Sequence, residues 1–316
     1  MAPTLQQFQD MERSASPAEL LNWRFQQALY RAYYDAYIKE RLENETTLES
    51  SARGELRRAK RVGALPTLAR AESILDRSVK EGVAGDLRAR VFELGEALYQ
   101  SIRMQLSVER YRAIGVERGA NLDAIDAPLN DRVWLKQQFE AIRRLSDEPQ
   151  RLQAIESILT RTDPGPGGYY DDLGNPARQP HLVQGPGLSG DPMLWNSRVG
   201  FGSRPEWPLA WCQNAESLYD TPLRLHYEHL DPSARYKVRI TYSGNAFVSR
   251  VRLDADGLEI HPLMKKADPP VPVEFEIPPQ ATADGNLTLM WESDPGRGRN
   301  GRGCQVGEVW LIKTSR

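Results

Sequence analysis

The prolines and glycines of this chain are unevenly divided, and this constrains its fold more than any other feature. Of the 22 prolines and 24 glycines in its 316 residues, 17 of each lie between residues 163 and 316. Proline lacks a backbone donor and glycine is entropically costly to order, so a long helix cannot continue through such a stretch. Apolar residues recur at helical spacing before residue 163 and alternate with polar residues after it.

We therefore predict a multidomain α + β chain. An α-helical bundle is expected over 1–162, a Pro/Gly-rich linker over 163–180 and an antiparallel β-sandwich over 181–316. The length is sufficient for each of the two folded parts to bury its own hydrophobic core.

The helical half begins with a long helix that has two apolar sides. Ser16 and Pro17, followed by Glu19, are typical of a helix start. One arc of that helix carries Leu21, Phe25, Ala28, Leu29, Ala32 and Ala36, and the opposite arc carries Trp23, Tyr30, Tyr34 and Tyr37. Either this helix lies centrally in a bundle, or one side docks against a partner. Further helices are expected over 66–80, 86–112, 132–145 and 148–159.

The second half is a succession of short alternating segments. In 236–242 the apolar residues Tyr236, Val238 and Ile240 share one face, as on a half-buried strand. Similar alternation follows in 273–277 and 287–291, and Asp256-Gly257 is typical of a two-residue hairpin. Many short strands at this spacing predict a sandwich or jelly roll.

The order of these segments resembles the galactose-binding-like jelly roll of carbohydrate-binding modules and of accessory domains in bacterial polysaccharide-degrading enzymes. The segments are 230–232 (LDP), 236–245 (YKVRITYSGN), 251–253 (VRL), 256–257 (DG), 275–278 (FEIP), 285–291 (GNLTLMW) and 308–312 (EVWLI). The likeness covers roughly residues 181–316. The run WRFQQALYRAYY at 23–34 resembles helical regions that follow the catalytic barrel in some bacterial glycoside hydrolases. The resemblance implies sugar binding on loops at one end of the sandwich, and a structural calcium; no cofactor is identified from the residues themselves.

Charge and composition exclude several classes of partner. With 41 Lys+Arg against 43 Asp+Glu, the formal net charge of -2 provides no overall field for nucleic acid. No segment approaches the roughly 20 apolar residues of a membrane span, and the N-terminus has no signal-peptide pattern. The compartment therefore stays open: extracellular or periplasmic if the chain is a piece of a secreted protein. The two cysteines, Cys212 and Cys304, either pair across the sandwich or are small buried hydrophobes.

The candidate ligand-binding residues are aromatic and polar side chains of the loop-rich stretches. Sugar rings stack their C–H faces on aromatic rings and pair their hydroxyls with polar groups. Two sets fit this chemistry: Tyr169, Tyr170, Trp195, Trp207 and Trp211 in the first, and Arg297, Arg299, Asn300 and Arg302 in the second. The arginine set suits acidic groups such as carboxylate or sulfate, although a solvated flexible hairpin tip explains it better.

No catalytic motif is present, but glycosidases need only two carboxylates at a fixed separation. Asp171 and Asp172 are the acids to test first, since Gly and Tyr neighbours favour an ordered loop; adjacent carboxylates also bind calcium or cap turns. His226 and His229 lie three residues apart in a strand-like segment and therefore point to opposite faces, which disfavours a metal site.

Our first hypothesis is a non-catalytic accessory region that binds polysaccharide or oligosaccharide, with a helical domain that docks to a catalytic domain of a larger parent protein. The second is a glycoside hydrolase or polysaccharide lyase with its site at the junction of the two halves. The third is a structural assembly protein whose Tyr/Trp side is an oligomer interface.

Overall fold

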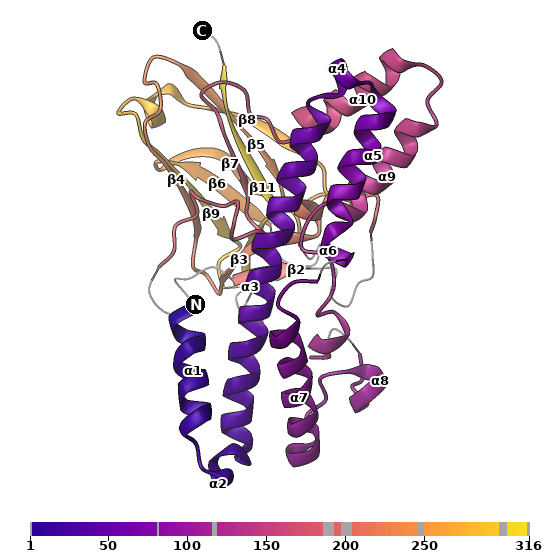
Figure 1. The fold of residues 1–316 in the computed structure, drawn as a ribbon. Coiled ribbons are helices and arrows are strands. Elements are labelled where there is room, and N and C mark those ends of the chain that lie inside the picture. The colour runs from indigo at the N-terminus through magenta and orange to yellow at the C-terminus, as the bar shows by residue number, and fades with distance from the viewer. Residues whose placement is uncertain are drawn as a thin grey trace. The chain divides into compact units, whose positions relative to one another are not determined.

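The chain folds into two compact units, each with its own core. A computed structural model describes residues 2–80, 82–115, 119–185, 193–196, 204–244, 250–296 and 302–314. The first unit extends to Leu152, and the second contains the described residues from Gln153 onward (Figure 1). The predicted order, helices first and antiparallel sheets second, is confirmed.

The first unit is built from helices. These are α1 (Ala2–Ser14), α2 (Pro17–Leu20), α3 (Trp23–Leu56), α4 (Ala59–Val62), α5 (Ala64–Leu75), α6 (Arg77–Lys80), α7 (Gly85–Ile102), α8 (Val108–Tyr111), α9 (Arg132–Arg143) and α10 (Glu148–Thr160), the last of which continues into the second unit. α7 ends at Ile102, before the predicted end of its helix, because Arg103 adopts a left-handed conformation with φ of 57°. None of the helices within the described ranges combines the length and apolar character that a membrane crossing requires.

The central position of α3 explains its two apolar sides. Its buried residues Leu29, Tyr30, Tyr33 and Tyr37 share one cluster with Val91, Leu94 and Leu98 of α7. The buried stripe therefore draws residues from both predicted arcs. The prediction that Leu21 belongs to the core stripe is wrong: this residue is 75% exposed, because it caps the short helix α2 and lies outside α3.

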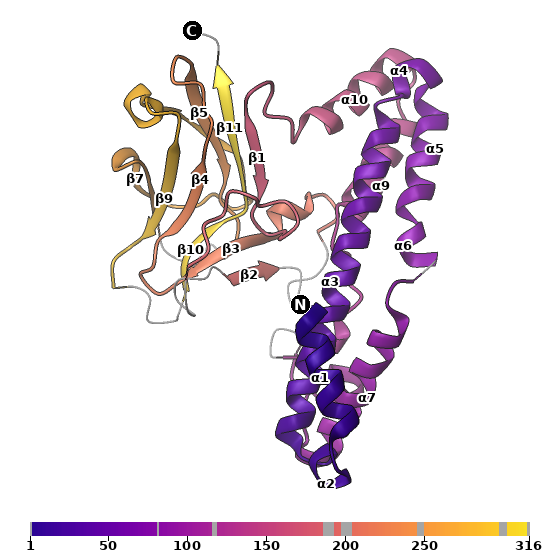
Figure 2. The ribbon, with the colours of Figure 1, turned by 60° about the vertical axis from the view of Figure 1, so that its left-hand side comes forward.

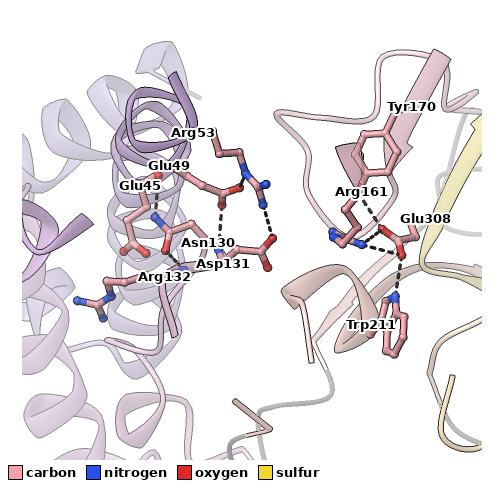
Figure 3. Close-up of polar contacts among 10 residues, drawn as sticks. All are labelled: Glu45, Glu49, Arg53, Asn130, Asp131, Arg132, Arg161, Tyr170, Trp211 and Glu308. Atoms are coloured by element: carbon pink, nitrogen blue, oxygen red, sulfur yellow. Dashed lines mark hydrogen bonds and ion pairs between the residues drawn. The ribbon is translucent and has the colours of Figure 1, made fainter. Parts of the chain in front are cut away.

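A ladder of buried charged residues continues the same helix. Arg41, Glu45, Glu49 and Arg53 are spaced four apart on α3 and are all buried. Glu45 accepts from the backbone N–H of Leu129 at 2.8 Å, and Glu49 accepts from that of Asp131 at 2.9 Å. Arg53 donates to the Asp131 carboxylate at 2.9 Å (Figure 3). The ladder thus binds the segment before α9 to α3 with paired charges, as burial of ionised groups requires.

The second unit contains antiparallel sheets (Figure 2). Its strands are β1 (Tyr169–Asp172), β2 (Met193–Asn196), β3 (Gln213–Leu218), β4 (Leu223–Tyr227), β5 (Arg235–Thr241), β6 (Val251–Ala255), β7 (Leu258–Met264), β8 (Val273–Ile277), β9 (Leu287–Ser293), β10 (Arg302–Val306) and β11 (Glu308–Thr314). The strand orders are β1-β11-β5-β8, β4-β9-β6-β7 and β10-β3-β2. One apolar cluster takes residues from both four-stranded sheets, so these two sheets pack face to face as a sandwich.

Residues 163–180, which the composition marks as linker, contribute a strand to this sandwich. Tyr169 to Asp172 form β1, which pairs with β11 in the register Tyr169 to Leu311. Gly168 precedes it in close contact, since a Cβ there would lie 2.6 Å from the carbonyl oxygen of Leu311. The two consecutive tyrosines supply the β-propensity that the surrounding glycines lack. The segment therefore presents its side chains at fixed positions.

The core of the sandwich also contains a fully bonded polar chain. Trp291 donates from Nε1 to the hydroxyl of Tyr242 at 3.0 Å, and that hydroxyl lies 2.6 Å from Nε2 of His261. Nδ1 of His261 lies 2.9 Å from the carbonyl oxygen of Pro262, which can only accept. The neutral ring therefore carries its proton on Nδ1, and burial lowers the pKa of His261.

Acidification is expected to destabilise the second unit through His261. The unfolded chain binds a proton near pH 6.5, whereas the folded core excludes it, so the free energy of unfolding falls as the pH drops below about 6.5. Urea unfolding at pH 7.5 and 5.5 measures this loss, and His261→Gln is expected to reduce it. A variant that keeps the full wild-type dependence would contradict the assignment.

The alternation of β9 gives a second prediction. Leu289 is fully buried between the sheets and its neighbour Met290 is half-buried on the other face. Leu289→Ala should lower the free energy of unfolding by about 2–5 kcal/mol because it leaves a cavity. Met290→Ala, which removes a side chain of similar size, should cost about 1 kcal/mol or less. Equal losses in chemical denaturation would show that the assigned faces of β9 are incorrect.

Candidate functional site

A buried carboxylate, Glu308, organises the surroundings of the candidate site. It begins β11, has no exposed surface and lies opposite Thr241 of β5. Arg161 donates to its two oxygens at 3.2 and 3.0 Å, and the Tyr170 hydroxyl donates at 2.9 Å. Trp211 Nε1 donates at 2.7 Å (Figure 3), and the Thr241 hydroxyl donates at 3.1 Å. These donors replace the water that an ionised carboxylate would lose on burial.

Two of the aromatic residues predicted from the loop-rich stretch, Trp207 and Trp211, lie together, and Trp211 bonds this carboxylate. Trp211 ends the short 3-10 helix η3 (Leu209–Trp211), and its ring centroid lies 6.3 Å from that of Trp207. The two ring planes meet at 65°, so they form an angled corner. Both residues are half-buried, and the guanidinium of Arg204 lies 4.4 Å above the Trp207 ring. We call Arg204, Trp207 and Trp211 the indole corner.

The two faces of β1 serve different clusters. Tyr170 points to Glu308 and packs against Trp310, with ring centroids 5.2 Å apart. Burial, and then the charge of Glu308, raises the pKa of Tyr170 well above its ordinary value. Tyr169 points to the other face, where its ring lies 4.9 Å from that of His181. Alternation along a strand therefore divides the predicted Tyr-Tyr-Asp-Asp group between two environments.

On that other face, Asp171 holds a histidine in one orientation. Its carboxylate is fully buried and lies 3.0 and 2.9 Å from Nδ1 of His181. The hydroxyl of Tyr227 donates to the same carboxylate at 3.0 Å, and burial together with the Asp171 charge raises the pKa of Tyr227. The His181 side chain remains 20% exposed. A carboxylate that orients an imidazole through Nδ1 is an arrangement that general bases use, and here it also ties the segment after β1 to β4.

Asp172, the other predicted catalytic acid, lies on the Glu308 side of β1 and is buried. Its backbone N–H donates to the carbonyl of Arg178 at 2.9 Å, which closes the turn after the strand. Consecutive strand residues point in opposite directions, so Asp171 and Asp172 face different surroundings. A catalytic role for either carboxylate stays a prediction.

The remaining predicted ligand residues lie largely outside the described structure. Trp195 occupies β2 opposite Asn214, but its side chain is outside the described part, as is that of Arg302 in β10. Arg297, Arg299 and Asn300 lie wholly outside the described residues. Before them, Asp294 pairs with Arg250 at 2.9 Å and fixes the end of β9.

Metal binding finds no support among the described residues, where no three His, Cys, Asp or Glu side chains gather as a metal site would require. His226 hydrogen-bonds Thr288 at 3.1 Å, and His229 occupies a turn with φ of 61°. Cys212 and Cys304 are free and buried, and burial raises the pKa of the Cys304 thiol to about 12. They act as small buried hydrophobes.

Sequence reasoning missed Glu308 and two of its partners, Arg161 and Thr241, and it missed His181 on the other face of β1. The one available signal was the position of Glu308 at the head of an otherwise apolar strand, EVWLI, where an acid needs partners if the strand is central.

Comparison with known proteins leaves the family open. No protein-family model and no curated protein matches the chain. Among solved structures, the ANX1 ectodomain from Arabidopsis thaliana shares 11% identity with a TM-score of 0.36, covering 48% of this chain and 42% of that one. A Bacteroides uniformis beta-glucuronidase shares 8% identity with a TM-score of 0.31, covering 46% of this chain and 18% of that enzyme. The chain thus spans less than half the length of either protein, and likenesses this remote do not identify a ligand.

Substitution of Glu308 tests whether it organises the corner. Glu308→Gln replaces one acceptor oxygen by an NH2 group, which cannot accept a hydrogen bond from the donors that surround it. The free energy of unfolding should therefore fall by about 3–5 kcal/mol. Trp fluorescence should shift to the red. Glu274→Gln is the matched control, because Glu274 pairs with Lys237 on the same sheet but is 37% exposed. It should cost less than about 1 kcal/mol. Equal costs would show that Glu308 has no special structural role.

Proposed function

We propose that the protein binds carbohydrate without transforming it, and that the indole corner is where a sugar ring binds. The observation that carries the proposal is the pair of half-buried indoles, one of them tethered by a 2.7 Å hydrogen bond to a buried carboxylate. A tethered ring loses little conformational entropy when a ligand stacks on it, which favours binding.

The chemistry of the corner suits a sugar. Indole faces accept the C–H side of a pyranose, while neighbouring polar side chains meet its hydroxyls. Arg204, whose guanidinium lies 4.4 Å above the Trp207 ring, supplies donors beside the indoles. Glu308 of β11 holds the Trp211 indole through one hydrogen bond, so a strand of the sandwich preorganises this part of the corner.

The angle between the rings also favours one kind of chain. Coplanar indoles would form a flat platform that matches several sugars of an extended, crystalline surface. Planes at 65° present no such platform, so one sugar ring can stack on only one of the two indoles. We infer that the ligand is a soluble or terminal sugar unit of a polysaccharide or oligosaccharide.

The chain would act as an accessory region of a glycan-degrading system, with a catalytic domain of a larger parent protein as its partner. A glycoside hydrolase or polysaccharide lyase remains the alternative. The Asp171–His181 pair supports it, because an imidazole held by a buried carboxylate can accept a proton.

Removal of the indoles tests the binding function. Trp207→Ala and Trp211→Ala should each weaken retention in affinity gels of soluble polysaccharides about tenfold, equivalent to about 1.4 kcal/mol of lost stacking. Trp23→Ala, which removes a half-buried indole from α3, is the control and should bind as the wild type does. Wild-type retention by both corner variants would refute the proposed site, and sugar release by the wild-type protein would favour the enzymatic alternative.

A further inference from the structure

The Arg204 guanidinium has no carboxylate partner within the described part of the chain. Its side chain is exposed, and its guanidinium carbon lies 4.4 Å above the Trp207 ring centroid. Its backbone carbonyl accepts from the N–H of Trp207 at 3.0 Å, which closes a tight turn. No carboxylate among the described residues pairs with this guanidinium.

Stacking on an indole determines the direction in which the guanidinium can donate hydrogen bonds. The group is planar and carries its N–H donors in that plane, so contact of its face with an indole leaves the donors directed sideways. A carboxylate or sulfate that meets this edge receives two parallel charge-assisted hydrogen bonds. Because Trp207 itself belongs to the indole corner, the donors lie at the border of the sugar site.

The nearest acid in sequence, Glu206, does not neutralise Arg204. It is exposed in the same turn, and no ion pair or hydrogen bond joins the two side chains in the described structure. Its negative charge would repel an anionic ligand, and salt would screen that repulsion. The turn therefore carries one group that would attract an acidic sugar and one that would oppose it.

We propose that the indole corner selects acidic sugars, with Arg204 binding the carboxylate or sulfate of a unit whose ring stacks on the indoles. This inference rests on the proposed carbohydrate-binding function and specifies its ligand class. The selectivity comes from one side chain, so it can be removed while the stacking surface remains.

Polymer pairs that differ only in charge test the inference with the full chain. Polygalacturonate is compared with its carboxyl-reduced form, and carrageenan with its desulfated form, in affinity gels at low and high salt. The wild type should bind at least one acidic polymer about tenfold more tightly than its neutral counterpart, with the difference shrinking as salt rises. The pair that shows the difference identifies the anionic group.

Two charge variants should move the preference in opposite directions. Arg204→Gln should remove most of the tenfold preference, and Glu206→Gln should increase it about twofold. Glu206→Gln should bind neutral polymer as the wild type does. Both residues are exposed, so the Tm of each variant should equal that of the wild type. An unchanged Tm shows that the variant is folded. Arg204→Lys should retain part of the preference, because it keeps the charge but loses the planar fork.

The failures of the two proposals are distinguishable. Equal binding of acidic and neutral polymers, unaltered by Arg204→Gln, overturns acidic selectivity and leaves the carbohydrate-binding function standing if Trp211→Ala still abolishes retention. Absence of retention on every polymer by folded wild-type protein overturns both.

Discussion

The burial of Glu308 is the constraint on which the rest of the second unit depends. An ionised carboxylate without exposed surface would be prohibitively costly unless several donors surround it. The four donors come from the segment after α10, from β1, from η3 and from β5, at sequence separations of 147, 138, 97 and 67 residues. One carboxylate therefore joins four parts of the chain that are distant in sequence. The same bond that satisfies Glu308 also orients Trp211, so the stability of the sandwich and the geometry of the indole corner have a common origin.

The first unit also buries charged side chains that are paired, and they lie on the helix α3. Arg41, Glu45, Glu49 and Arg53 occupy one stripe of α3, where a purely apolar stripe would also have supported packing. Replacement of such a stripe by hydrophobic residues is often neutral or stabilising, so the ladder is better explained by specificity than by stability. Glu45 and Glu49 bind backbone N–H groups of an irregular segment, which apolar side chains cannot do. The ladder defines one register for that segment along α3.

The sequence alone predicted the features that depend on local periodicity. The helical and sheet halves, the alternation of 236–242 and the apolar character of both sides of α3 follow from spacing along the chain. Leu21 was misplaced because spacing does not locate a helix boundary to one residue: Asn22 caps α3 through its side chain, which puts Leu21 outside the helix. Trp207 and Trp211 were identified by residue type, but their 65° angle depends on Glu308, which is one acid among 43 and whose partners lie far away in sequence. Long-range polar contacts leave no periodic signal, and this is why the organising residue was missed.

The four residues of β1 contact two different clusters. If Tyr169 to Asp172 had formed a loop, their four side chains could have converged on one ligand, which is what their composition suggests. Because β1 pairs with β11, Tyr170 contacts Glu308 and Asp171 contacts His181. The two tyrosines, and likewise the two acids, therefore belong to different clusters. The groups that remain partly exposed beside these clusters are the indoles on one side and the imidazole on the other. Strand formation in a segment rich in glycine and proline thus distributes the four adjacent side chains between two separate clusters.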